Sequence, residues 1–222
     1  MKSKIQAYWL LIPIPLIFLV WFFYAEKKEA PLRYLPYFGP KFVDSNKDST
    51  YHSIKDFSFV NQHGETITLD SLKNKIIITE FFFTTCQSIC PIMNTNLQKV
   101  YQRFAKQNDL LILSHTVDPE QDSVPVLKTY AELQGVKDRR WMFVTGSKKD
   151  LYQAARKSYL LNAEEGDGGE DDFIHTQNFA LVDKNKHIRG YYDGTDSVEI
   201  NRLITDLHLL IQEHDYKKNS KP

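Results

Sequence analysis

Stretch 76–83 is apolar at nearly every position and rich in β-branched or aromatic residues, and stretch 110–117 is predicted to be another strand. An unbroken run of this kind is typical of a strand that is covered on both faces. Stretch 90–106 instead carries its apolar residues at helical spacing, which predicts a helix. The same two patterns predict a further strand over 141–145 and further helices over 124–134, 149–159 and 197–214.

Two hairpins complete the pattern. Strands 56–61 and 65–69 flank a turn that ends in Gly64, and strands 178–183 and 187–192 flank a short polar turn. Strands and helices alternate between these hairpins, which predicts an α/β domain with a central, mainly parallel sheet and helices on both faces. Open sheets of this class bind ligands at the carboxyl ends of their strands. The end of strand 76–83 is therefore the expected place for a site.

The chain begins with a second kind of apolar segment. Residues 7–25 carry no charge and would form a helix about 28 Å long at ~1.5 Å per residue, close to the ~30 Å hydrocarbon core of a bilayer. The run is long for a cleaved signal peptide and lacks a clear cleavage site, so we interpret it as a retained single-pass anchor. The expected organisation is a stub over 1–6, a transmembrane anchor over 7–25, a tether over 26–50, a domain over 51–216 and a tail over 217–222.

The charges that flank the apolar run only weakly indicate the orientation of the chain in the membrane. Lys2 and Lys4 precede the apolar run, and Lys27 and Lys28 follow it, so the positive-inside count is nearly a tie. A short stub before a large domain favours a cytoplasmic stub, with the domain on the outer or periplasmic side of the cell membrane. The 28 basic and 28 acidic residues cancel, and this balance argues against a nucleic-acid partner.

The only two cysteines, Cys86 and Cys90, lie between the end of strand 76–83 and the predicted helix. The amino end of a helix offers unpaired N–H groups and a positive dipole end, and both favour thiolate over thiol. A close thiolate pair can exchange electrons as a disulfide or hold a soft metal ion. A purely structural disulfide is the less attractive reading, because a bridge across so few residues closes a very small loop.

Histidine distinguishes the two chemical readings. Thioredoxin-type exchange generally uses CxxC together with a proline before the next-to-last strand pair, but 172–177 contains no proline and has His175 instead. Two thiolates and one imidazole form a soft set suited to Cu(I), with Cu(II) or Zn(II) as other occupants. His115 is expected to be an ordinary histidine within a strand, and His187 begins a strand. The other histidines are expected to be solvated: His52, His63, His208 and His214.

Over residues 53–214, and in its amino-terminal anchor, the chain resembles the Sco/SenC copper metallochaperones, which serve assembly of the dinuclear copper centre of cytochrome c oxidase. The motifs that carry the resemblance are Phe82-Phe83-Thr84-Thr85-Cys86 to Cys90-Pro91, Thr116-Val117-Asp118-Pro119-Glu120-Gln121-Asp122, Val144-Thr145-Gly146, and His175-Thr176 followed by Ala180-Leu181-Val182-Asp183. The resemblance implies a thioredoxin-like fold in which Cys86, Cys90 and His175 bind copper. This chain departs from many members of the family at Gln87, where they have proline, and at Ile174, where they have aspartate.

The function expected from these residues is that of a membrane-anchored copper chaperone, more a binding protein than an enzyme. Its implied partners are the copper-bearing subunit of cytochrome c oxidase and a thiol reductant that keeps both cysteines reduced. The alternative is a thiol–disulfide reductase that acts on the cysteines of that target or of other exported proteins. Asp118 is a candidate for a contact near the metal or with a partner, whereas Asp122 or Ser123 is expected to cap helix 124–134. The acidic, glycine-containing stretch 164–172 is expected to be a loop.

Overall fold

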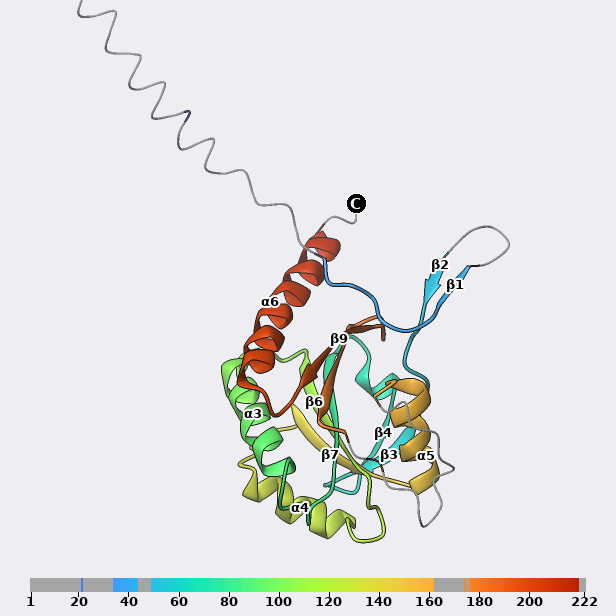
Figure 1. Ribbon diagram of the computed structural model, residues 1–222, viewed down its shortest axis with the longest axis vertical. Helices are drawn as coiled ribbons and strands as arrows, with labels where there is room; N and C mark the ends of the chain where they lie inside the picture. The colour runs from blue at the N-terminus through green and yellow to red at the C-terminus, as the bar shows by residue number, and fades with distance from the viewer. Residues whose placement is uncertain (1–20, 22–33, 44–48, 162–173, 175, 220–222) are drawn as a thin grey trace, which may run out of the picture. The chain divides into compact units, whose positions relative to one another are not determined.

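The computed structural model describes residues 21, 34–43, 49–161, 174 and 176–219. It divides the chain into two compact units, 1–34 and 35–222, and the second contains every strand (Figure 1). The predicted anchor 7–25 lies outside the described residues except for Trp21. Within the described part of the chain, no helix combines the length and the apolar character needed to cross a bilayer.

A seven-stranded mixed sheet forms the centre of the domain, in the order β4-β3-β7-β6-β5-β8-β9. Its strands are β3 (Ser58–Asn61), β4 (Thr66–Thr68), β5 (Ile76–Phe82), β6 (Leu110–Thr116), β7 (Trp141–Thr145), β8 (Asn178–Val182) and β9 (Ile188–Asp193). The prediction of a mainly parallel sheet is wrong, because only β5, β6 and β7 are mutually parallel. The two predicted hairpins add antiparallel strands at both sides of this trio.

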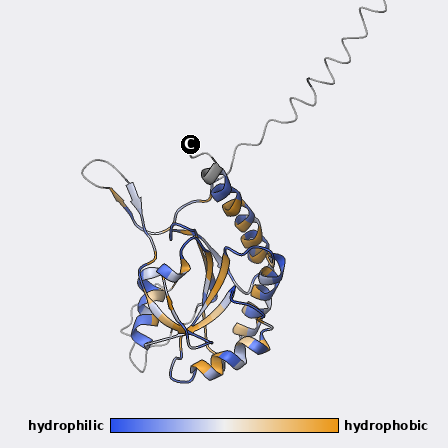
Figure 2. Cartoon of the chain, turned by 180° about the vertical axis from the view of Figure 1, so that it is seen from behind, coloured by the Kyte–Doolittle hydropathy of each residue, from blue (hydrophilic) through white to orange (hydrophobic). Residues whose placement is uncertain are grey.

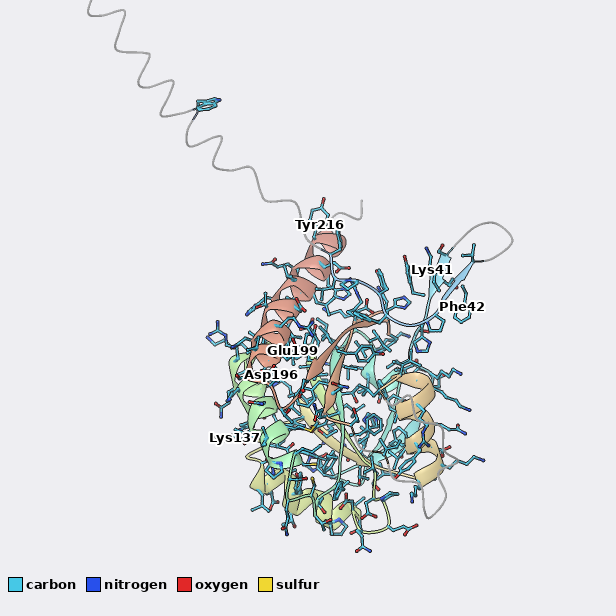
Figure 3. The ribbon with its side chains drawn as sticks, in the orientation of Figure 1. Lys41, Phe42, Lys137, Asp196, Glu199 and Tyr216 are labelled. Atoms are coloured by element: carbon cyan, nitrogen blue, oxygen red, sulfur yellow. The ribbon has the colours of Figure 1, made fainter. Side chains whose placement is uncertain are left out.

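Helices cover both faces of the sheet, as predicted (Figure 1). They are α3 (Cys90–Arg103), α4 (Val124–Leu133), α5 (Lys148–Gln153), the π-helical turn η2 (Ala154–Ser158) and α6 (Ser197–Asn219), with a 3-10 turn, η1 (Asp70–Leu72), before β5. The predicted helix 149–159 is thus an α-helix that continues as a π-helical turn. Figure 3 labels Asp196 and Glu199 at the start of α6 and Tyr216 near its end.

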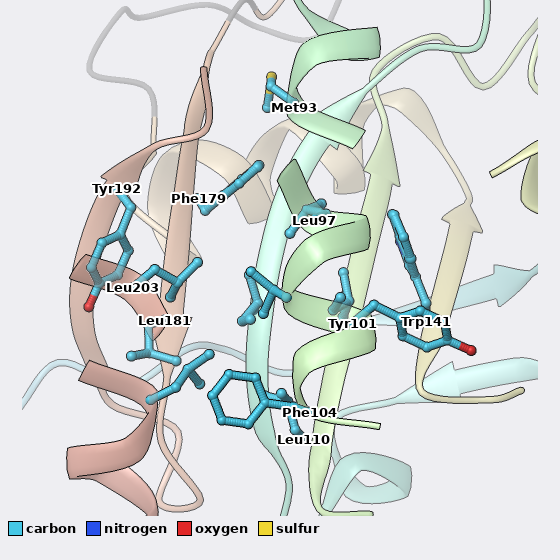
Figure 4. Close-up of a cluster of buried hydrophobic side chains, with 14 of the residues drawn as sticks. Met93, Leu97, Tyr101, Phe104, Leu110, Trp141, Phe179, Leu181, Tyr192 and Leu203 are labelled. Atoms are coloured by element: carbon cyan, nitrogen blue, oxygen red, sulfur yellow. The ribbon is translucent and has the colours of Figure 1, made fainter. Parts of the chain in front are cut away.

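The sequence of strand β5 lacks alternation between apolar and polar residues because both faces of the strand are buried. Ile76, Ile78 and Phe82 belong to the hydrophobic cluster beneath α3 and α6, part of which is drawn in Figure 4. Ile77 and Phe81 belong to the cluster on the opposite face, beside α5 and η2. Both faces of the strand are therefore buried, which is what an unbroken apolar run predicts. Figure 2 shows the central strands as the most continuously hydrophobic part of the domain.

Leu35 and Phe38, in the described part of the predicted tether, pack against the hydrophobic clusters of the domain. Leu35 is buried in the cluster beneath α6, and its carbonyl accepts a hydrogen bond from Arg189. Two short strands, β1 (Lys41–Val43) and β2 (Ser49–Tyr51), pair as an antiparallel ribbon that the sequence pattern did not predict. Figure 3 labels Lys41 and Phe42 on this ribbon.

The prediction that His52 is solvated is wrong for the same reason. His52 follows β2, is buried, and its Nε2 lies 2.8 Å from the carbonyl oxygen of Ser158. His115 is a fully buried core histidine within β6, and its Nδ1 lies 3.0 Å from Thr79 Oγ1. Burial lowers the pKa of His115 to about 3, so its imidazole is neutral.

Candidate metal centre

Both cysteines lie at the carboxyl end of β5, where the topology predicts a site. The strand ends at Phe82, and α3 begins at Cys90 with Pro91 in its first turn. Proline is favoured there because the first N–H groups of a helix have no partner within the helix. Cys86 precedes the helix, in a turn where its N–H donates to the carbonyl of Phe83 over 3.2 Å. One sulfur is therefore carried by a loop and the other by a helix.

The two thiols are free and have different surroundings. Cys86 is partly exposed, whereas Cys90 is only 3% exposed and belongs to the cluster beneath α3. Burial acts to raise the pKa of Cys86, but hydrogen bonds from the Cys90 thiol and from the backbone N–H groups of Cys90 and Ser88 lower it to about 7. Burial raises the pKa of Cys90, and the neighbouring Cys86 and Glu80 raise it further. Cys86 is thus the sulfur that ionises first.

This difference predicts that alkylation of Cys86 depends steeply on pH. The thiolate is the reactive form, and it is populated above the thiol pKa. The rate of alkylation by iodoacetamide should therefore rise with a midpoint near pH 7, with Cys90 modified far more slowly. Mass spectrometry of peptides from the reduced chain measures both rates. A midpoint near the ordinary cysteine value of about 8.5 would show that the hydrogen bonds around Cys86 do not act as described.

Asp122 secures the loop before Cys86, so of the two residues predicted to cap the following helix, Asp122 and Ser123, it is not the one at the N-cap. Its fully buried carboxylate accepts hydrogen bonds from the N–H of Thr84 over 3.2 Å and from the hydroxyls of Thr84 and Thr116. Ser123 is the residue at the N-cap of α4, and neither residue supplies a side-chain cap. Asp122 therefore ties the loop that carries Cys86 to the end of β6.

Asp118 lies at the same end of the sheet, directly after β6 and Val117. Its carbonyl accepts the N–H groups of Gln121 and Asp122, and its own N–H donates to the Thr116 hydroxyl over 2.9 Å. Its side chain is partly exposed, and the structure gives its carboxylate no hydrogen bond among the described residues. The predicted contact of Asp118 with the metal surroundings or a partner stays a prediction.

His175, the predicted third ligand, lies outside the described residues. Its neighbours are described: Ile174 is buried in the cluster beside α5, and the Thr176 hydroxyl accepts the N–H of Asn178 over 3.2 Å. Strand β8 begins at Asn178 and runs antiparallel to β5, so its first residue lies toward the carboxyl end of β5. In the described part of the chain, no three residues of the metal-binding types His, Cys, Asp and Glu form a group that could hold a metal ion.

A buried carboxyl group, Glu80, lies on β5 behind the dithiol, and the sequence analysis missed it. Glu80 is 1% exposed and accepts a hydrogen bond from the Ser114 hydroxyl over 2.6 Å. Burial raises the pKa of Glu80 to about 7, and the Ser114 hydrogen bond only partly opposes this. The signal in the sequence was one acidic residue inside a run that is otherwise apolar and predicted to be covered on both faces.

This arrangement supports two kinds of chemistry. A partly exposed thiolate beside a buried thiol is typical of pairs that exchange disulfides, because the exposed sulfur attacks and the buried sulfur resolves the mixed disulfide. The same two sulfurs, once both are deprotonated, are soft ligands that select Cu(I) and other thiophilic ions. Neither reading requires movement of the strand that carries the site.

Comparison with known proteins identifies the family of this chain. The family model described as SCO1/SenC matches residues 45–212. A SCO1 protein homolog from Bacillus subtilis is 31% identical over 163 residues, which cover 72% of this chain and 84% of that protein. The solved structure of BsSco, described as a member of the Sco family of cytochrome c oxidase assembly proteins with a disulfide switch, is 30% identical. It superposes with a TM-score of 0.61 over 71% of this chain and 92% of that one.

A copper-bound structure has the same fold. Arabidopsis thaliana ScoI with copper bound gives a TM-score of 0.56 over 70% of this chain and 98% of that chain, at 21% identity. At that level of identity the likeness concerns the fold alone, an α/β, thioredoxin-like arrangement with a mixed central sheet and helices on both faces.

Proposed function

This chain belongs to the SCO1/SenC family, and on that basis we propose that it is a copper chaperone anchored in the cell membrane. Its cargo is copper, held by the Cys86 and Cys90 thiolates and the His175 imidazole. The recipient is the dinuclear copper centre in the copper-bearing subunit of cytochrome c oxidase. Residues 7–25 form the anchor, and the domain lies on the outer or periplasmic side of the membrane.

One observation carries the proposal: two free thiols meet at the carboxyl end of β5 in a chain of this family. The donor set fits copper better than zinc, because structural zinc sites are closed by four ligands and the chain has no third cysteine. Two sulfurs and one imidazole suit the low coordination numbers of Cu(I), with Cu(II) as a second state.

His175 is the proposed third ligand for reasons of topology. The residue before it, Ile174, is buried in the core, and the residues after it lead into β8, the antiparallel neighbour of β5. The chain beside His175 is thus fixed to the strand that ends next to the cysteines. The resemblance of the His175-Thr176 motif to that of the family points the same way.

The unequal burial of the sulfurs suits release as well as binding. Buried Cys90 would hold the ion firmly, and partly exposed Cys86 would be the ligand that an incoming sulfur or imidazole replaces. Only thiolates bind copper, so binding releases protons and requires both cysteines to be reduced. A thiol reductant is therefore a necessary partner wherever the surroundings are oxidising.

A second candidate function, thiol–disulfide reduction, is favoured by a separate observation. The pKa of Cys86 is lowered to about 7 while that of Cys90 is raised, which is the division of roles between an attacking and a resolving sulfur. The substrate would be a disulfide of the same oxidase subunit or of another exported protein. Reduced chain would become oxidised as the substrate disulfide is reduced to two thiols.

An anaerobic titration tests the main proposal. The full chain, purified in mild detergent and reduced, is titrated with Cu(I) against a competing chelator. We expect one equivalent to bind the reduced chain and none to bind after the Cys86–Cys90 disulfide has formed, because a disulfide has no thiolate to offer. Failure of the reduced chain to withdraw Cu(I) from the chelator would contradict the proposal.

A further inference from the structure

Helix α4 is apolar on two sides, although only one side faces the core. Leu127 and Ala131 are buried, at 0% and 5% exposure. Val126, Thr129 and Leu133 lie at i, i+3 and i+7, which places them in a second stripe along the helix. Val126 is 38% exposed and Leu133 is 78% exposed. A helix that only packs on a core has no need of this second stripe.

The second stripe forms one wall of a groove of about 430 Å³. The groove is lined by Thr84, Pro125, Val126, Thr129, Tyr130 and Leu133. None of these side chains is charged at neutral pH. By contrast, the hollow of about 330 Å³ between the start of β3 and α5 is lined by Lys55, Asp56, Asp150 and Lys157 among others. Figure 2 shows hydrophobic residues on α4 next to hydrophilic ones.

The groove lies beside the loop that carries Cys86. Thr84, which lines it, is two residues from Cys86 and is held in place by the buried carboxylate of Asp122. Tyr130, which also lines it, stacks on Phe82 with ring centroids 5.3 Å apart. The Tyr130 hydroxyl accepts a hydrogen bond of 2.6 Å from Asn94 on α3. Both helices and the cysteine loop therefore fix this groove relative to the sulfurs.

We propose that this groove is the docking surface for the protein that receives copper. It would take an uncharged segment of that protein with an aliphatic side chain close to the acceptor's own copper ligands. The inference rests on the proposed function, because handover by ligand exchange requires acceptor atoms to reach the ion held at Cys86. An apolar anchor in a desolvated groove next to the exchanging ligand supplies affinity where it is needed.

The chemistry of the groove favours a protein over a lipid surface. Binding to anionic membranes draws on clusters of lysine and arginine, and no basic side chain lines the groove. A protein segment with an aliphatic anchor needs only an uncharged hollow and shape complementarity.

The test compares transfer by groove variants of the full chain. Cu(I)-loaded chain is mixed with the purified soluble copper-bearing domain of a cytochrome c oxidase, and the transfer rate is measured at concentrations below saturation. Leu133→Lys and Leu133→Glu should each slow transfer about tenfold or more, the loss expected when an interface anchor is removed. Both variants should still load one equivalent of Cu(I). The matched control is Val43→Lys, because Val43 is 62% exposed on β1, away from α4, and its variant should transfer within about twofold of the parent rate.

Several outcomes would overturn the inference. If both Leu133 variants transferred copper at the parent rate, the groove would be excluded as the docking surface. If only one of the two introduced charges slowed transfer, the effect would be one of general electrostatics and not of apolar docking. If the Leu133 variants lost binding to vesicles of anionic phospholipid while their transfer rate stayed unchanged, this surface would be assigned to the membrane. The affinity of the copper-free chain for the acceptor domain is measured in parallel. This affinity tests docking separately from copper loading, so a failure of the docking inference can be distinguished from a failure of the proposed copper-binding function.

Discussion

Replacing Cys90 with serine should weaken Cu(I) binding by the reduced chain by more than about a hundredfold, and Cys86→Ser and His175→Ala should each do the same. Loss of a residue that merely supports a ligand already costs ~10–100-fold in metal affinity, so loss of a ligand should cost more. A hydroxyl is a poor substitute because Cu(I) prefers soft sulfur donors over oxygen. Competition with a chelator at fixed pH measures all three losses on one scale.

The His175→Ala variant separates the two candidate functions. It keeps both sulfurs, so its exchange with a disulfide such as oxidised dithiothreitol should stay within a few-fold of the parent rate, while its copper affinity falls. His208→Ala is the matched control, since His208 is exposed on α6 and its ring contacts Phe104 rather than any sulfur. Copper binding that survives His175→Ala would refute the three-ligand site and leave a dithiol reductase as the better account.

Most of the fold could be predicted because burial leaves a recognisable pattern in the sequence, either an unbroken apolar run or apolar residues at helical spacing. Strands β5 and β6 were predicted to within one residue, since each is buried at every position and most of those positions are apolar. Helix α3 was predicted because its buried residues recur at helical spacing. The ribbon of β1 and β2 was missed because its strands are three residues long and largely exposed. Without a buried face there is no period to detect.

The site was only partly predictable, because its supporting contacts join residues far apart in the sequence. An aspartate just before a helix looks like a cap, and nothing local indicates that Asp122 binds Thr84, 38 positions earlier in the chain. Glu80 was missed because run 76–83 was predicted as a strand from its apolar residues, and this pattern assigns no role to the one acidic residue within it. The cysteines were predictable because strand end, thiols and helix start are consecutive in the chain. His175 followed from topology and resemblance, and its role remains a prediction.

The largest stability effect is expected at Arg189, a fully buried arginine on β9. Its guanidinium binds the carboxylates of Asp183 over 3.0 Å and of Glu213 over 2.8 Å, and all three side chains are at most 1% exposed. It also donates to the carbonyls of Leu35 and Pro36. One side chain therefore joins the first residues of the domain, the β8–β9 hairpin and α6.

Arg189→Met should lower the free energy of unfolding by about 3–5 kcal/mol, because removing one member of a buried ion pair is strongly destabilising. The matched control is Arg202→Met, because Arg202 and its partner Glu199 on α6 are partly exposed, at 45% and 29%, and loss of this pair should cost no more than ~1 kcal/mol. Urea denaturation followed by circular dichroism measures both variants. A loss below about 1 kcal/mol for Arg189→Met would mean that water reaches the cluster or that the carboxylates find other partners.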